Sequence, residues 1–229
     1  MERLCGTHIS VLGAGRTDAG VHSLGQAAGV HVPERWTAAE MKRALNAVLP
    51  SDVRISGSVP MRPEFHARFS ALSRSYRYLV GTDENAEGPF RNRRELAWRR
   101  PLDRSLLDAA AALVVGDHSF RGFAVKGTAP ANDDHHCIVQ CAEWVERNEA
   151  QSGSPIGVAF EITANRFLHH MVRFLVGTML DIASGKRELE VITKLLKSGD
   201  NSTVSPPAPA HGLYLERVEY PTELYLVNA

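Results

Sequence analysis

The sequence predicts an α+β fold with mainly antiparallel strands, and the order of elements in its second half is the main reason. Alternating Tyr76, Tyr78 and Val80 indicate a strand at 74–81. A helix at 102–115 follows, which Asp103 can cap and Gly116 can end. The same patterns then predict, in order, two strands, a long apolar helix, a short helix and a strand at 137–147, 156–164, 167–184, 189–197 and 213–220. Without the short helix, the order is β-α-β-β-α-β.

That order is the ferredoxin-like arrangement, and the first half carries part of it. Strands are expected at 8–14, 26–32 and 52–58. A helix at 38–48 lies among them, with Thr37 and Glu40 spaced as a capping box. We therefore expect two ferredoxin-like lobes, at 1–69 and 70–229. The first lobe would lack its leading strand and most of its leading helix, which suggests an N-terminal truncation and a first half that folds poorly.

Composition places the chain among globular proteins and excludes several classes. Of its 229 residues, 44% are apolar and 23% are charged, and no apolar run is long enough to cross a membrane. Three cysteines and no recognisable export signal fit a cytoplasmic protein. The formal net charge is zero, so the overall balance does not indicate a nucleic-acid partner. Between Arg54 and Arg104, however, eleven arginines stand against six acidic residues. This excess suits either phosphate binding or an ordinary solvated surface.

A glycine-bracketed loop at 15–22, Gly-Arg-Thr-Asp-Ala-Gly-Val-His, is the strongest candidate site. Its one carboxylate, Asp18, follows Arg16 closely and lies between two expected strands. Loops on a rigid sheet hold reactive groups while leaving them accessible. Asp before Ala-Gly is also common turn chemistry, so these residues alone leave a turn and a reactive carboxylate both open.

The loop resembles the TruA family of tRNA pseudouridine synthases, and later segments extend the resemblance. They include His-Ala-Arg-Phe-Ser-Ala, Arg-Ser-Tyr-Arg-Tyr, Gly-Asp-His-Ser-Phe, the Met-Val-Arg helix and an Ala-Pro-Ala-His-Gly-Leu strand. These segments begin, in order, at 66, 74, 116, 171 and 208. Several ordered matches are much more specific than any one of them.

The resemblance implies a role for five residues of this chain. Asp18 would be the catalytic nucleophile, and Arg173 would contact it. Tyr76 would stack on the target base and take part in proton transfer, and Arg16 would hold the strand from which that base is flipped. Arg68 would be an RNA or structural contact.

The same resemblance implies a reaction and partners. Uridines at positions 38–40 of the tRNA anticodon stem-loop would become pseudouridine, in an RNA cleft between the two lobes of a homodimer. One tRNA would be bound across both subunits. Breaking the N1–C1′ bond and joining C5 to C1′ requires no redox change, so no cofactor and no metal are expected. A carboxylate that attacks C1′, or stabilises positive charge there, is enough.

Two alternatives and one candidate metal site remain to be weighed. A truncated relative could bind tRNA without catalysis, and a nucleoside glycosidase would need a second carboxylate near Asp18, which does not appear. His169 and His170 could bind a metal. We discount that site because neighbours on an expected helix face different ways.

Overall fold

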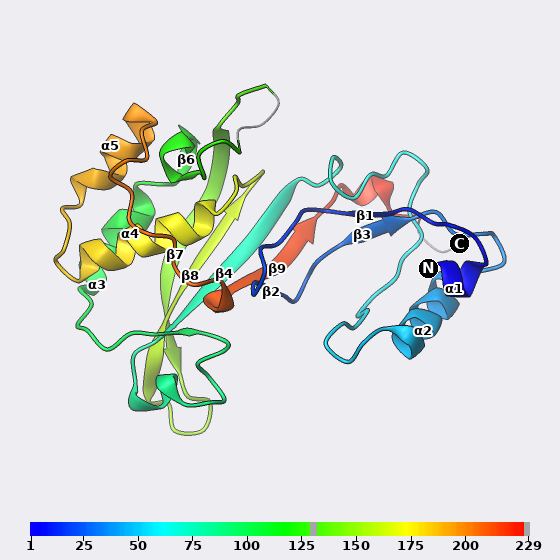
Figure 1. Ribbon diagram of the computed structural model, residues 1–229, viewed down its shortest axis with the longest axis horizontal. Coiled ribbons are helices and arrows are strands. Elements are labelled where there is room, and N and C mark those ends of the chain that lie inside the picture. The colour runs from blue at the N-terminus through cyan, green and yellow to red at the C-terminus, as the bar shows by residue number, and fades with distance from the viewer. Residues whose placement is uncertain (129–131, 227–229) are drawn as a thin grey trace. The chain divides into compact units, whose positions relative to one another are not determined.

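The computed structural model describes residues 1–128 and 132–226 of the chain (Figure 1). It divides into two compact units. The first comprises Met1–Arg16, Gln26–Leu72 and Val218–Ala229, and the second comprises Thr17–Gly25 and Ser73–Arg217. The second unit therefore includes the loop that carries Asp18, which the sequence placed in a lobe at 1–69. The strands expected on either side of this loop, at 8–14 and 26–32, belong to the first unit, so sequence order alone did not predict this division.

The second unit is built on a mostly antiparallel sheet, which confirms the predicted α+β class. Three long strands form its centre: β4 (Ser73–Gly81), β8 (Pro155–Ala164) and β7 (His136–Asn148) are antiparallel neighbours in that order. The full order is β2-β9-β4-β8-β7-β6, with β5 paired to β4. The remaining strands are β2 (His22–Ser23), β5 (Leu96–Ala97), β6 (Gly116–Ser119) and β9 (Leu213–Glu219).

Helices α3 (Arg104–Ala112) and α4 (Met171–Ala183) pack on one face of this sheet, with α5 (Glu190–Ser198) beside them (Figure 1). The buried core joins Tyr78 and Phe160 of the sheet to Leu175 and Met179 of α4. Burying such side chains stabilises the fold by about 1.5–3 kcal/mol each. The core therefore fixes α4, which carries part of the site, to the sheet.

Asp103 caps α3 as predicted, since its carboxylate accepts hydrogen bonds from the backbone N–H groups of Ser105 and Leu106. The helix ends at Ala112 and not at 115, because Gly116 is already the first residue of β6.

Helix α4 begins at Met171, four residues later than predicted. His170 has a left-handed backbone with φ of 62°, so the segment before Met171 is a turn and not helix. Phe167 and Leu168 continue the apolar pattern of the helix in sequence, but they lie before this turn and outside the helix.

The first unit contains α1 (Glu2–Cys5), α2 (Ala38–Val48) and the antiparallel pair β1 (Val11–Gly13) and β3 (Ala28–Val30). The capping box of α2 is present as predicted: the Thr37 side chain accepts from the backbone N–H of Glu40, and the Glu40 carboxylate accepts from the backbone N–H of Thr37.

Short 3-10 turns in both units complete the description, at Glu84–Glu87, Arg121–Phe123, Ala210–Gly212 and Thr222–Leu224.

The predicted strand at 52–58 is wrong. No strand forms there, and most of these residues are exposed. The amide of Asn46 binds both the N–H and the C=O of Ile55, at 2.8 and 3.0 Å. A side chain therefore takes the place of a neighbouring strand.

No helix in the described residues has the length and apolar character needed to cross a membrane.

Candidate active site

Asp18 lies in a tight turn of the second unit. The N–H of Val21 donates to the carbonyl of Asp18 at 3.1 Å, and Gly20 at the third position of the turn has φ of 84°. A left-handed third residue is what a type II turn requires, and glycine adopts it without strain. Asp18 is thus both a turn residue and an available carboxylate, so the two interpretations left open by the sequence are compatible.

Arg173, near the start of α4, forms an ion pair with Asp18. Its Nη1 lies 2.8 Å from Oδ2 of Asp18, and its Nε donates to the carbonyl oxygen of Ala208 at 2.7 Å. These two partners hold the guanidinium from two directions. The Arg173 side chain is also largely buried, with 14% of it exposed. Charge-assisted hydrogen bonds of this kind are about twice as strong as neutral ones.

Two histidines also lie against Asp18, and the sequence argument that discounted them is wrong. Nε2 of His170 lies 3.0 Å from Oδ2, and Nε2 of His169 lies 3.4 Å from Oδ1. The argument assumed a helix, in which adjacent side chains diverge. Because both residues precede α4 in a turn in which His170 is left-handed, their rings lie with centroids 4.1 Å apart, tilted by 51°, and face the same carboxylate.

His170 favours the neutral imidazole. Burial lowers its pKa below the ordinary value of 6.5, and the charge of Arg173 lowers it further, against the opposing effect of Asp18. A neutral imidazole beside Asp18 adds no second full positive charge to the site.

Tyr76 lies on β4, on the core side of the sheet, in edge-to-face contact with Phe167 at 4.9 Å between ring centroids. Burial raises the pKa of Tyr76 above its ordinary value, and the nearby Asp18 charge adds to the effect while Arg74 opposes it. The phenol therefore stays protonated at neutral pH.

The segment that precedes β9 supports both Arg173 and the sheet. The hydroxyl of Tyr78 donates to the carbonyl of Pro209 at 2.8 Å, next to the Ala208 carbonyl that Arg173 binds. A Cβ at Gly212 would lie 2.6 Å from the Tyr78 ring. Glycine there lets the segment approach the ring closely.

The other two residues predicted for the site, Arg16 and Arg68, belong to the first unit. Arg16 is exposed. The guanidinium of Arg68 lies over the ring of Phe69, 5.6 Å from its centroid. Their predicted roles therefore remain predictions.

Comparison with known proteins identifies the family. A family model described as tRNA pseudouridine synthase matches residues 110–221. The curated tRNA pseudouridine synthase A of Thermus thermophilus is 38% identical over 210 residues, which is 92% of this chain and 80% of that protein. The Porphyromonas gingivalis enzyme of the same name is 37% identical over 95% of this chain and 83% of its own length.

The chain belongs to the tRNA pseudouridine synthase A family. A third relative of that name, from Chloroflexus aurantiacus, is 38% identical over 92% of the chain. The family model covers the segment that holds His169, His170, Arg173 and Ala208. The pairwise matches reach further and extend the likeness over nearly the whole chain.

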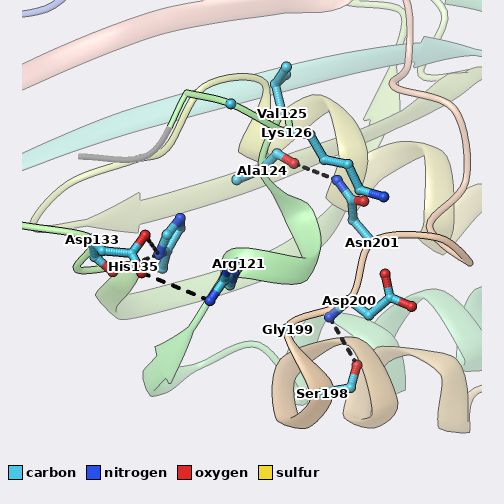
Figure 2. A pocket seen from close by; sticks show the side chains of 11 residues that line it. Arg121, Ala124, Val125, Lys126, Asp133, His135, Ser198, Gly199, Asp200 and Asn201 are labelled. Atoms are coloured by element: carbon cyan, nitrogen blue, oxygen red, sulfur yellow. Dashed lines mark hydrogen bonds and ion pairs between the residues drawn. The ribbon is translucent and has the colours of Figure 1, made fainter. Parts of the chain in front are cut away.

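A cavity of about 440 Å³, whose lining does not include Asp18, occurs in this tRNA pseudouridine synthase A homologue (Figure 2). No sequence pattern predicted it. Figure 2 shows Arg121 facing Asp133, and Asn201 donating to the carbonyl of Ala124 at 2.9 Å. The lining also includes Lys126 and Asp200. Two cationic and two acidic side chains line it, so charge gives this cavity no clear preference for an anion.

Proposed function

We propose that this chain converts uridines at positions 38–40 of the tRNA anticodon stem-loop to pseudouridine, with Asp18 as nucleophile. As a member of its family, the chain is a tRNA pseudouridine synthase, an isomerase that acts on tRNA. The observation that supports Asp18 is the ion pair at 2.8 Å with a largely buried Arg173. A carboxylate held in this way has a cationic partner and keeps one geometry.

The chemistry needs only one such group. Isomerisation breaks the N1–C1′ bond of uridine, turns the freed uracil and joins its C5 to C1′, while C5 loses a proton and N1 gains one. An ionised Asp18 attacks C1′ or stabilises the positive charge that develops there. In this proposal Arg173 binds Oδ2 and leaves Oδ1 on the more exposed side, next to His169.

Tyr76 is proposed as the base platform. Flipped bases are commonly held on aromatic faces, and such stacking is worth about 1–3 kcal/mol per base. Tyr76 is half-buried and packs against Phe167 with the two rings at 78°, and in this proposal one face of its ring receives the uracil. The protonated hydroxyl is then a hydrogen-bond donor for the uracil or for a proton in transit.

The remaining expectations belong to the same proposal. Arg16 and Arg68 would contact RNA, the protein would act in the cytoplasm as a homodimer, and one tRNA would be bound across both subunits. The neighbour order β9-β4-β8-β7, with α3 and α4 on one face, supports a ferredoxin-like description of residues 70–229. A ferredoxin-like lobe at 1–69 rests on the sequence pattern.

The test is a conversion assay that also maps the product. An unmodified tRNA transcript with uridines at 38–40 is incubated with the parent chain, and pseudouridine is located by chemical mapping. A second transcript carries cytidine at those positions. The Asp200→Asn variant shows whether the loss of an exposed carboxylate outside the site affects conversion. We expect product at 38–40 with the parent and the control variant, and none in the second transcript.

Two results would overturn the proposal. Product only at other positions would refute the predicted target. Binding of tRNA by the folded parent without any conversion would favour the alternative of a non-catalytic tRNA-binding protein.

A further inference from the structure

The carboxylate of Asp18 and the imidazoles of His169 and His170 form a compact set of metal-ligand atoms. One ligand atom from each lies within 4.8 Å of the other two, and no other group of three or more such residues occurs in the part of the chain that the structure describes. Two nitrogens and one carboxylate oxygen are a donor set that Zn²⁺ accepts in proteins.

Two spacings in this set are close to those of a tetrahedral site. With metal–ligand bonds of about 2.0–2.1 Å, neighbouring ligand atoms around zinc lie about 3.3–3.4 Å apart. In this structure Nε2 of His169 lies 3.4 Å from Oδ1 of Asp18, and Nε2 of His170 lies 3.0 Å from Oδ2. Because the two nitrogens lie against different oxygens, the ring of His170 must turn toward Oδ1 for all three ligands to reach one ion.

The site is open enough for an ion to enter. The side chain of His169 is 45% exposed, whereas those of Asp18 and His170 are 23% and 24% exposed. Three protein ligands would leave a fourth position for water, as in zinc sites that are not purely structural.

Arg173 opposes the ion and sets a limit on its affinity. Its guanidinium lies 2.8 Å from Oδ2 of Asp18, so a divalent cation there would meet a like charge. We expect the ion to use Oδ1, next to His169, while Arg173 keeps Oδ2. This arrangement predicts weaker binding than in a zinc site that has no cationic side chain beside its ligands.

We propose that Asp18, His169 and His170 bind a divalent transition-metal ion of the Zn²⁺ type, and that the bound ion withholds Asp18 from substrate. The binding itself is independent of the proposed function. Its inhibitory consequence rests on the proposed role of Asp18 as nucleophile.

The direct test is calorimetric titration of the full chain with ZnCl₂ after treatment with a chelator. Because Cys141 is exposed and a thiolate also binds zinc, every protein carries Cys141→Ser. His169→Asn and His170→Asn each remove one ligand, and asparagine tolerates the left-handed backbone at 170. His136→Asn is the matched control, since its imidazole lies 3.2 Å from Asp117 but belongs to no three-ligand group.

We expect one equivalent of zinc to bind the parent and the His136→Asn control equally. Binding should be at least tenfold weaker in each of the other two variants. Circular dichroism establishes that each variant is folded, and if one is not, the other decides. Absence of zinc binding to the parent would overturn the proposal. Folded His169→Asn and His170→Asn variants that bind zinc as tightly as the parent would overturn it too.

A conversion assay tests the inhibitory half. Zinc should inhibit pseudouridine formation by the parent and by His136→Asn at concentrations near the measured dissociation constant, and EDTA should reverse the effect. Zinc that binds at this site but leaves the rate unchanged would overturn that half. A chain that makes no pseudouridine even without zinc would refute the proposed function, while the calorimetry would still decide on the metal site.

Discussion

At the scale of single residues, Asp18 owes its geometry mainly to Arg173. The guanidinium binds two partners at once, the carboxylate of Asp18 and the carbonyl of Ala208. A lysine at this position carries the charge but has no planar pair of donors to serve both. With lysine, a positive charge would remain beside Asp18, but the carboxylate would lose its fixed orientation.

Arg173→Lys should accordingly lower kcat more than it raises KM. Losing one charge-assisted hydrogen bond costs about 1.5–3 kcal/mol, which is about a 10- to 100-fold loss of rate. Single-turnover and steady-state kinetics on tRNA measure the two effects. Arg187→Lys is the control, because Arg187 binds the carbonyl of Thr203 away from the site. Equal losses in both variants would contradict a specific role for Arg173.

Tyr76 allows its ring to be tested apart from its hydroxyl. If stacking is its main contribution, Tyr76→Phe should stay within a few-fold of the parent, while Tyr76→Leu should lose about 10- to 100-fold in kcat/KM. Rates of pseudouridine formation, with melting curves for both variants, provide the check. An equal fall in the two variants would assign the effect to the hydroxyl.

At the scale of elements, the last turn of α4 is held by an ion pair that titrates. Lys186 lies 2.9 Å from Asp181, and the carbonyl of Ala183 accepts from the N–H of Asp103 at the start of α3. Burial alone would raise the pKa of Asp181. Hydrogen bonding and the charges of Lys186 and Arg187 outweigh burial and hold the pKa below its ordinary 3.8.

A lowered pKa means that the folded state binds this proton less readily than the unfolded state. The stabilisation is therefore complete above about pH 3.8 and is lost as the pH falls through the folded-state value. Asp181→Asn should cost about 1–2 kcal/mol at pH 7 and show a shallower loss of stability on acidification. Urea unfolding from pH 7 to 3 tests this. Asp108→Asn is the control: it breaks the ion pair with Arg104, in which the Asp108 side chain is 52% exposed, and should cost about 0.5 kcal/mol or less. If the stability of Asp181→Asn fell with pH as steeply as that of the parent, the argument would be refuted.

Helices were easier to predict than strands or the site, because their signals are local. The capping residues Thr37 and Asp103 act on backbone groups within three residues, so sequence alone identified both helix starts. The absent strand at 52–58 depends on a side chain nine residues away, Asn46, which no periodicity reveals.

The site was predictable where family motifs mark it. Asp18 and Arg173, 155 residues apart in sequence, were paired in advance only through the resemblance. The approach of His169 and His170 depends on one left-handed residue, and histidine carries no strong sequence signal for that conformation. The structure has a turn where the sequence predicts the first turn of the helix, and this turn brings both histidines to Asp18.

At the scale of the whole molecule, the two units differ greatly in what they bury. The large apolar core lies within the second unit, from Tyr78 to Leu213. Among the described residues of the first unit, only four apolar side chains are buried: Cys5, Ala14, Met41 and Ala67. Its sheet has two short strands, and two-stranded sheets are marginally stable by themselves.

We therefore predict that the first unit opens more readily than the second. Amide hydrogen exchange should show lower protection in α2 and β1 than in β7 and β8, because local stability follows burial. The measurement is native-state exchange followed by mass spectrometry of peptides from each unit. A single protection level across both units would show that they unfold together and would contradict this prediction.

The most direct test of the central claim is single-turnover conversion of an unmodified tRNA by Asp18→Asn beside the parent. Asparagine keeps the size of the side chain and removes its charge and nucleophilicity. We predict pseudouridine from the parent and none from the variant, while tRNA binding by the variant stays within a few-fold. Conversion by the variant at a rate within tenfold of the parent would contradict the assignment of Asp18 as the nucleophile.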